Sequence, residues 1–232
     1  MQPLSTGALR VSTLREQVAN LIRRAIVEMR LKPGDRLIER ELIEWTGVSR
    51  ATVREAIREL ATEGLVRTVA QKGAVVASPS RREAAEVYEV RAALEGLAGR
   101  LFAERADSKQ RAALVRAYQT IREVLGPSAD TWAMLEAKNA FYAVLLAGAG
   151  NAAMVSMLEL LQARITMLRA ASMTQPGRAA EAIAEIGEIV RAIEARDGAA
   201  AAAACAYHVQ QAGHYALIAL SEAAESEPPS GQ

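Results

Sequence analysis

Residues 46–64 read TGVSRATVREAIRELATEG, and this stretch decides the fold of the first third of the chain. Gly47 stands where a tight turn between two helices needs a left-handed backbone. Ser49 can cap a helix that runs from Arg50 to Glu63 and ends at Gly64. The stretch therefore predicts a capped helix that follows directly on a tight turn.

Two residue stripes run along this predicted helix. The apolar stripe recurs at i, i+4 and i+7 and should face a small core: Val53, Ile57 and Leu60. The basic stripe recurs at i, i+4 and i+8: Arg50, Arg54 and Arg58. A helix whose first turn carries arginine among small residues can enter the major groove of DNA and reach base edges. The alternative is a solvated face, in which these arginines pair with Glu55, Glu59 and Glu63.

The segments on either side complete a winged helix-turn-helix. Ser12 can cap a first helix that runs to about residue 29, and a short second helix is predicted over Glu39–Trp45. Two β-prone runs follow the third helix and predict a small hairpin: Leu65–Thr68 and Ala74–Ala77. Two helices joined by a glycine-containing turn, with a hairpin after them, are typical of a DNA-binding unit.

Composition excludes several other classes of protein. Of the 232 residues, 51% are hydrophobic and only 4% are aromatic, while alanine makes up about a fifth. Alanine favours helix, so a β-sandwich or barrel is disfavoured. The longest apolar runs are too short to span a bilayer, and the N-terminus lacks the pattern of a signal peptide. The single Cys205 has no internal partner, which suits a reducing compartment, so we expect a cytoplasmic protein.

The net charge of +1 hides an uneven distribution along the chain. The first 78 residues carry thirteen Lys and Arg against nine Asp and Glu, a balance of +4, so the remaining residues carry −3. A basic segment suits a polyanionic partner. Arginine dominates the basic residues here, and its planar guanidinium binds phosphates and guanine edges through paired hydrogen bonds better than lysine does. The charge therefore supports double-stranded DNA as a partner of the first segment.

The remainder of the chain reads as a helical bundle. A break near residues 78–80 is followed by five turn signals, at 106–108, 126–128, 148–151, 175–177 and 196–198. These turns divide the rest of the chain into six helical segments. We therefore expect a mostly α protein, with a winged helix-turn-helix at residues 1–78 and an all-α bundle of six to seven helices at 81–224. The polar, proline-containing residues 225–232 are expected to form a disordered tail.

Several of these stretches resemble one known family. The stretches at 31–37, 47–60 and 63–66 look like the winged helix-turn-helix of the GntR superfamily of bacterial transcriptional regulators. The stretch VYEVRAALE at 87–95 resembles the first helix of the FCD domain, the all-helical effector and dimerisation domain of its FadR-like branch. The resemblance implies a homodimer that binds operator DNA and responds to a small molecule.

The resemblance also implies which residues contact DNA. They are an arginine of the second helix, the first turn of the third helix and the tip of the wing: Arg40, Ser49, Arg50, Ala51, Thr52, Arg54, Lys72 and Gly73. Position 51 is often polar in the family. Ala51 here can shift base preference, since a methyl group suits contact with thymine.

Many FCD domains hold a divalent metal ion through one aspartate and three histidines, and the resemblance maps these four ligands onto this chain. The corresponding positions hold Lys138, Tyr142, Ile186 and His208, so one ligand of four is retained. A protonated lysine cannot ligate a metal, and one imidazole does not hold such an ion alone. We therefore expect no metal and no other cofactor. His214 lies six residues after His208, so it should face elsewhere, at the surface.

Cations in place of acidic ligands favour an anionic effector. Lys138 and Tyr142 are four apart on one helix, and with His208 and two arginines they form the predicted effector site; the arginines are Arg91 and Arg164. A cation in an apolar pocket needs an anion, which is either Glu95 or a ligand. This reading predicts a metal-independent site for a small organic acid. The alternative pairs Lys138 with Glu136 or another surface acid and leaves the site vestigial.

The function predicted on these grounds is a ligand-responsive, sequence-specific transcriptional regulator, released from its operator as a repressor when the effector binds. An activator of the same family is an alternative, and so is a partner-binding helical protein with a degenerate winged domain. An enzyme is disfavoured, because two histidines, one cysteine and no metal-ligand spacing leave little for catalysis.

Overall fold

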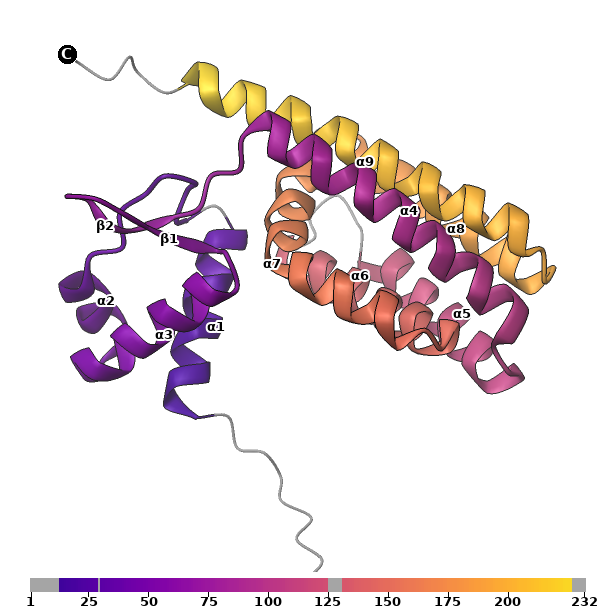
Figure 1. Cartoon of the computed structure of the whole chain (residues 1–232), viewed down its shortest axis with the longest axis horizontal. Coiled ribbons are helices and arrows are strands. Elements are labelled where there is room, and N and C mark those ends of the chain that lie inside the picture. The colour runs from indigo at the N-terminus through magenta and orange to yellow at the C-terminus, as the bar shows by residue number, and fades with distance from the viewer. Residues whose placement is uncertain (1–12, 29, 125–130, 227–232) are drawn as a thin grey trace, which may run out of the picture. The chain divides into compact units, whose positions relative to one another are not determined.

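The computed structural model describes residues 13–28, 30–124 and 131–226, which divide into two compact units on either side of the bond between Ala77 and Ser78. In the first unit (Figure 1), three helices precede a two-stranded sheet: α1 (Leu14–Val27), α2 (Glu39–Thr46), α3 (Arg50–Thr62), β1 (Val66–Val69) and β2 (Gly73–Val76). The predicted winged helix-turn-helix is thus present. The cap of α1 is Thr13 rather than Ser12, because Glu16 completes a capping box with Thr13; Ser12 lies outside the described residues.

The core of this unit lies between α1 and α3. Ile22, Val53 and Leu60 are fully buried there, as predicted for Val53 and Leu60. Ile57, the third residue of the predicted apolar stripe, is only partly buried and lines the cleft beside α3. Two ion pairs join the same helices at the edge of the contact: Arg15 with Glu59 at 2.9 Å and Arg23 with Glu63 at 2.7 Å. Glu59 and Glu63 therefore hold α1 against α3 and do not neutralise the arginine stripe.

The wing is an antiparallel hairpin with a three-residue loop. Val66 pairs with Val76 and Val69 with Gly73, so both strands lie one residue away from their predicted bounds. Gln71 and Gly73 have positive φ angles of 64° and 77°, which let the chain reverse within the loop. A bridge from Arg36 to Val75 adds the segment before α2 to the same sheet.

The second unit is all helical in the described residues. It contains α4 (Arg81–Arg105), α5 (Ser108–Val124), α6 (Thr131–Ala149), α7 (Ala152–Met173), α8 (Arg178–Glu194) and α9 (Gly198–Ser226). The predicted turn at 126–128 lies outside the described residues. Helix α9 continues through residues 225 and 226, which the prediction assigned to the tail, and residues 227–232 are not described. No described helix is both long and apolar enough to cross a bilayer.

Helices α4 and α9 run side by side over much of their length (Figure 1). Their contact is close because small residues face each other across it. A Cβ atom on Gly99 would lie 2.7 Å from the carbonyl oxygen of Ala201 and 2.6 Å from Sγ of Cys205. The alanine-rich start of α9 therefore serves close helix packing, which a larger side chain would prevent.

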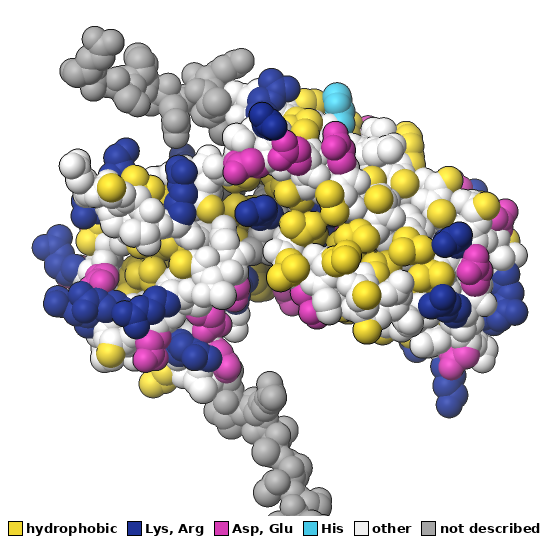
Figure 2. All heavy atoms as spheres, in the orientation of Figure 1, with side chains coloured by type: hydrophobic (Ala, Val, Ile, Leu, Met, Phe, Trp, Pro, Cys, Tyr) yellow, Lys and Arg dark blue, Asp and Glu magenta, His cyan; other side chains and the backbone are white. Residues whose placement is uncertain are grey.

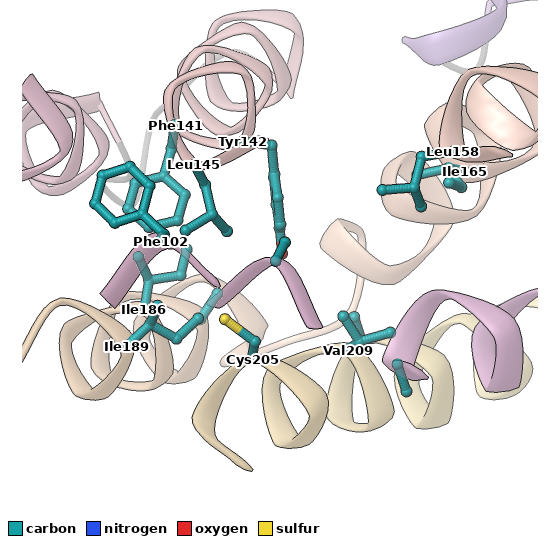
Figure 3. Close-up of a cluster of buried hydrophobic side chains, with 14 of the residues drawn as sticks. Phe102, Phe141, Tyr142, Leu145, Leu158, Ile165, Ile186, Ile189, Cys205 and Val209 are labelled. Carbon is teal, nitrogen blue, oxygen red and sulfur yellow. The ribbon is translucent and has the colours of Figure 1, made fainter. Parts of the chain in front are cut away.

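The apolar core of the unit gathers around Phe102 of α4. Figure 3 shows it among side chains of α6 and α8, and Cys205 and Val209 of α9 lie nearby. Ile186 belongs to this apolar cluster and is fully buried in it. The position that the resemblance assigned to a metal ligand is therefore a core position.

Candidate functional site

The first turn of α3 is exposed and capped as the sequence predicts. The backbone N–H of Thr52 donates to Oγ of Ser49 at 3.2 Å, and the two hydroxyl oxygens lie 2.9 Å apart. The side chains of Arg50 and Ala51 are exposed beside this cap, and Arg40 is exposed on α2. The cap therefore fixes the backbone of the turn while these side chains remain available to a partner.

Two arginines of α3 are held by an acid from the neighbouring helix. Glu39 at the start of α2 accepts a hydrogen bond from Nε of Arg54 at 2.7 Å, and Nε of Arg50 lies 3.8 Å away. The hydrogen bond from Arg54 lowers the pKa of Glu39 and raises that of Arg54. The sequence had offered Glu55, Glu59 and Glu63 as partners, but the acid that pairs with these two arginines is Glu39.

A cleft of about 500 Å³ separates α3 from the wing, and it is lined by basic side chains. Arg54 and Arg58 line it from α3, Lys72 and Gly73 line it from the wing, and Arg36 lines it from the segment before α2. The structure thus brings together the predicted residues Arg54, Lys72 and Gly73. Sequence reasoning missed Arg36, although its place directly after the predicted turn at 32–35 could have placed it on the sheet edge.

A second cluster of polar side chains lies inside the helical unit. Eight polar or charged residues are buried there, drawn from five helices: Arg91, Glu95, Lys138, Arg169, Ser172, Arg178, Glu185 and His208. We call these eight residues the buried polar cluster. The predicted residues Arg91, Lys138 and His208 belong to it, and Tyr142 is buried beside it. Arg164 does not, because it is exposed on α7; Arg169, five residues later, points inward instead.

Two arginines meet one carboxylate at one end of the cluster. Nε of Arg91 donates to Glu95 at 2.9 Å, and Nη2 of Arg169 lies 3.8 Å from the same carboxylate oxygen. The guanidinium of Arg169 lies over the ring of Tyr142 at 4.2 Å. Burial alone would raise the pKa of Glu95, but Arg91 and Arg169 outweigh it and lower this pKa. Glu95 is therefore a carboxylate shared by two cations.

A second ion pair lies at the other end. Arg178 donates two hydrogen bonds of 2.7 Å to Glu185, and Nδ1 of His208 hydrogen-bonds the same carboxylate. Burial lowers the pKa of His208 to about 4, so its imidazole is neutral and Nδ1 carries the proton that Glu185 accepts. Arg178 and Glu185 were missed from the sequence. Glu185 sits at a core-facing position of α8, three residues after Ala182 and four before Ile189, and a charge there signals a buried partner.

Lys138 lies among these groups without a carboxylate of its own. Its side chain is 2% exposed, and Nζ donates to the thioether sulfur of Met173 at 3.8 Å. Burial and the nearby Arg169 and Arg178 lower its pKa well below the ordinary value. Glu136, two residues earlier, is exposed, so the alternative of a surface pair between Glu136 and Lys138 is wrong.

The donor set of the cluster does not fit the metal ion that the FCD resemblance implies. In the described part of the chain, no three His, Cys, Asp or Glu residues lie together as a metal-ligand group. His208 and Glu185 are turned toward Arg178, and Lys138 adds a further basic group. A divalent cation would meet mostly cationic neighbours here.

Replacing Lys138 by methionine should stabilise the protein. An unfolded lysine takes up a proton at neutral pH, whereas the buried amine resists it, so Lys138 destabilises the folded state below the ordinary lysine pKa. We expect Lys138→Met to raise the free energy of unfolding by about 1–4 kcal/mol at pH 7, or several degrees in Tm. Calorimetry from pH 7 to 10 checks this, since the gain should shrink as the pH rises. A lower Tm at pH 7 would contradict it.

Both units of the chain match known protein families. Residues 14–76 match the family of bacterial regulatory proteins named gntR, and residues 86–211 match the FCD domain. A probable D-xylose utilization operon transcriptional repressor from Paenarthrobacter nicotinovorans is 32% identical over 200 residues, covering 85% of this chain and 86% of that protein. The HTH-type transcriptional regulator YdhC of Bacillus subtilis is 25% identical over 185 residues, covering 80% and 83% of the two chains.

A solved structure has a fold similar to that of this chain. The E. coli protein McbR/YncC superposes with a TM-score of 0.71 at 23% identity, over 87% of this chain and 95% of that one. The family is one of DNA-binding transcriptional regulators rather than enzymes. With a winged helix-turn-helix over residues 14–76 and an FCD domain over residues 86–211, the chain belongs to the GntR family of bacterial transcriptional regulators.

Proposed function

We propose that this protein is a repressor that binds an operator through α3 and the wing and leaves it when a small organic acid enters the helical unit. The observation that carries the proposal is the cation excess of the buried polar cluster, where Lys138 lies beside three arginines and two carboxylates. The repressor function named for the Paenarthrobacter relative supports the sign of control. Arg40 and the first turn of α3 would then contact operator DNA together with Arg54, Lys72 and Gly73.

The ion pair at Glu39 gives a physical route to DNA binding. Phosphates and guanine edges can replace Glu39 as the partner of Arg54 and Arg50, since both are exposed and only one side of each is occupied. The free protein then keeps the two arginines ordered at a modest cost, because exposed ion pairs contribute little. On this proposal, Glu39 holds the side chains of Arg50 and Arg54 in place until operator DNA replaces it as their partner.

We also propose a homodimer that joins through the outer face of α4 and α7. Leu160 and Met157 of α7 are 84% and 56% exposed, and Val90 of α4 is also exposed. Figure 2 shows hydrophobic side chains gathered on this face of the helical unit. A two-fold dimer would present two copies of α3 to the two halves of a palindromic operator, which supports a second copy of this chain as the partner.

The substitution Leu160→Arg should weaken this dimer. A charged side chain at the most exposed leucine of the face would have to be buried without a partner on both subunits. We expect a shift from dimer to monomer in light scattering at micromolar concentration, with unchanged circular dichroism. The matched variant Arg191→Ala changes an exposed side chain of α8 and should remain dimeric. A dimeric Leu160→Arg protein would exclude this face as the interface.

Promoter binding tests the proposed function. The full-length protein should retard labelled DNA from the region upstream of its own gene, and its affinity should fall steeply with salt as phosphate counterions are released. A panel of organic acids should include one that releases the DNA. Retardation that only increases with an acid would favour the activator alternative. Failure to retard any of this DNA would favour the partner-binding alternative with a degenerate winged domain.

A further inference from the structure

The buried polar cluster contains several hydrogen-bonding atoms that have no partner. In the part of the chain that the structure describes, six buried atoms in and beside the cluster have no partner: Tyr88 Oη, Arg91 Nη1, Glu95 Oε2, Arg169 Nε, Ser172 Oγ and Arg178 Nε. Five of the six can donate a hydrogen bond and one can only accept. A buried donor without a partner costs about 1–3 kcal/mol. So many donors at one place indicate a missing acceptor.

The charges of the cluster point to the same kind of group. Three arginines face two carboxylates, and burial keeps His208 neutral. Glu181 also approaches Arg178 at 3.8 Å, but its side chain is 52% exposed and solvent screens its charge. The buried groups therefore carry one positive charge in excess before Lys138 is counted, and a protonated Lys138 would make the excess two.

From these two observations we propose that the cluster binds a small dianion of the dicarboxylate class and that Lys138 takes up one proton as the ligand binds. The inference rests on the proposed function, because it names the effector class for that same site. The first carboxylate of the ligand would accept from the unpaired arginine donors. The second would accept from Lys138, whose amine donates to the thioether sulfur of Met173.

The proton uptake follows from the surroundings of Lys138. The charged and titratable groups that act on it come from the four neighbouring helices: Arg91 of α4, Arg169 of α7, Arg178 and Glu185 of α8, and His208 of α9. Glu95 of α4 and Tyr142 of α6 are buried in the same interior. Burial, together with the excess of cations over anions in this set, lowers the pKa of the amine well below its ordinary value. A bound dianion reverses the local balance and favours the ammonium form. A monocarboxylate neutralises only the arginine excess, so it should bind without a proton.

Titration calorimetry with the full-length protein tests the proposal directly. The probes are malonate, succinate and glutarate, with propionate and butyrate as matched monocarboxylates. Titrations in HEPES and in Tris report the protons exchanged, because these buffers differ in ionisation enthalpy. Between pH 7 and 9 both carboxylates of each dianion remain ionised. We expect at least one dicarboxylate to bind with proton uptake by the protein, and with affinity that falls as the pH rises.

Three variants separate the role of Lys138 from general electrostatics. Lys138→Met should abolish the proton uptake and the preference for dicarboxylates. Lys138→Arg supplies a permanent cation and should bind the dianion without taking up a proton. Lys109→Met removes an exposed lysine of α5 and should behave as the parent protein does.

The outcomes distinguish this inference from the proposed function. Dicarboxylate binding without proton uptake overturns the inference, and so does unchanged uptake in Lys138→Met. If none of the three dicarboxylates binds while another organic acid releases the operator, the dianion inference fails and the proposed function stands. If a dicarboxylate binds with proton uptake but no promoter DNA is retarded, the proposed function fails and the site assignment stands.

Discussion

The variant Arg178→Met should lose about 3–5 kcal/mol of its free energy of unfolding at pH 7, because it leaves the carboxylate of Glu185 buried without its bidentate partner. For a chain of this size, such a loss lowers Tm by about 10 °C or more. Thermal unfolding followed by circular dichroism measures it. The double variant Arg178→Met/Glu185→Leu removes both charges and should recover most of the loss.

The pH dependence of this loss has a definite sign. The pKa of Glu185 is lowered in the folded protein, so its pair contributes stability above the ordinary carboxyl pKa and loses it as the pH falls through the lowered value. The difference between parent and Arg178→Met should thus be full at pH 7 and shrink below about pH 4.5. A single variant as stable as the parent at pH 7, or a double variant no better than the single, would show that the pair does not stabilise the bundle.

The variant Arg54→Ala should weaken operator binding by about 10- to 100-fold per subunit, the range typical of a lost base contact of 1–3 kcal/mol. Arg54 lines the cleft between α3 and the wing, and its side chain is exposed there. Because a dimer presents two copies, the measured loss should be larger still. Gel retardation with specific and scrambled DNA measures affinity and specificity together.

Two further variants help to interpret the operator affinity measured for Arg54→Ala. Glu39→Gln removes the acid that competes with DNA for Arg54 and Arg50, so its operator affinity should rise a few-fold rather than fall. Arg191→Ala removes an exposed arginine of α8 and should leave affinity unchanged. If Arg54→Ala retards the operator as the parent does, while circular dichroism shows it folded, α3 does not read the DNA as proposed.

The DNA-binding unit could be predicted in detail because its signals are local. Gly47 adopts the left-handed conformation with φ of 70°, and Ser49 caps α3, as the sequence indicates. The bounds of both strands were wrong by one residue, since the alternation in so short a strand does not fix where the loop begins. The partner of Arg54 was also missed, because Glu39 lies fifteen residues away on another helix.

The interior of the helical unit was harder to predict because its pairings are not local. Arg178 and His208 meet on Glu185 across a sequence distance of up to thirty residues. The family correspondence pointed to Ile186, one residue from the side chain that reaches His208. A shift of one residue along a helix turns a side chain by about 100°. An alignment error of one residue therefore assigns the role of a ligand to a side chain that faces the apolar core. Arg164 was predicted to enter the site but is exposed, whereas Arg169, which the sequence did not single out, is buried in it.

Helix α4 begins three residues after the winged unit ends and carries Arg91 and Glu95 in its third and fourth turns. At about 1.5 Å per residue, its first turn lies only some 15 Å along the axis from Arg91. Gly99 locks the later part of this helix against α9, so that part is a fixed anchor. If a ligand binds at Arg91 as proposed, this helix segment and residues 78–80 form the covalent path from the ligand to the winged unit. On that proposal, the length of one helix segment, rather than the size of the domain, sets the distance along the chain between the ligand and the DNA-binding unit.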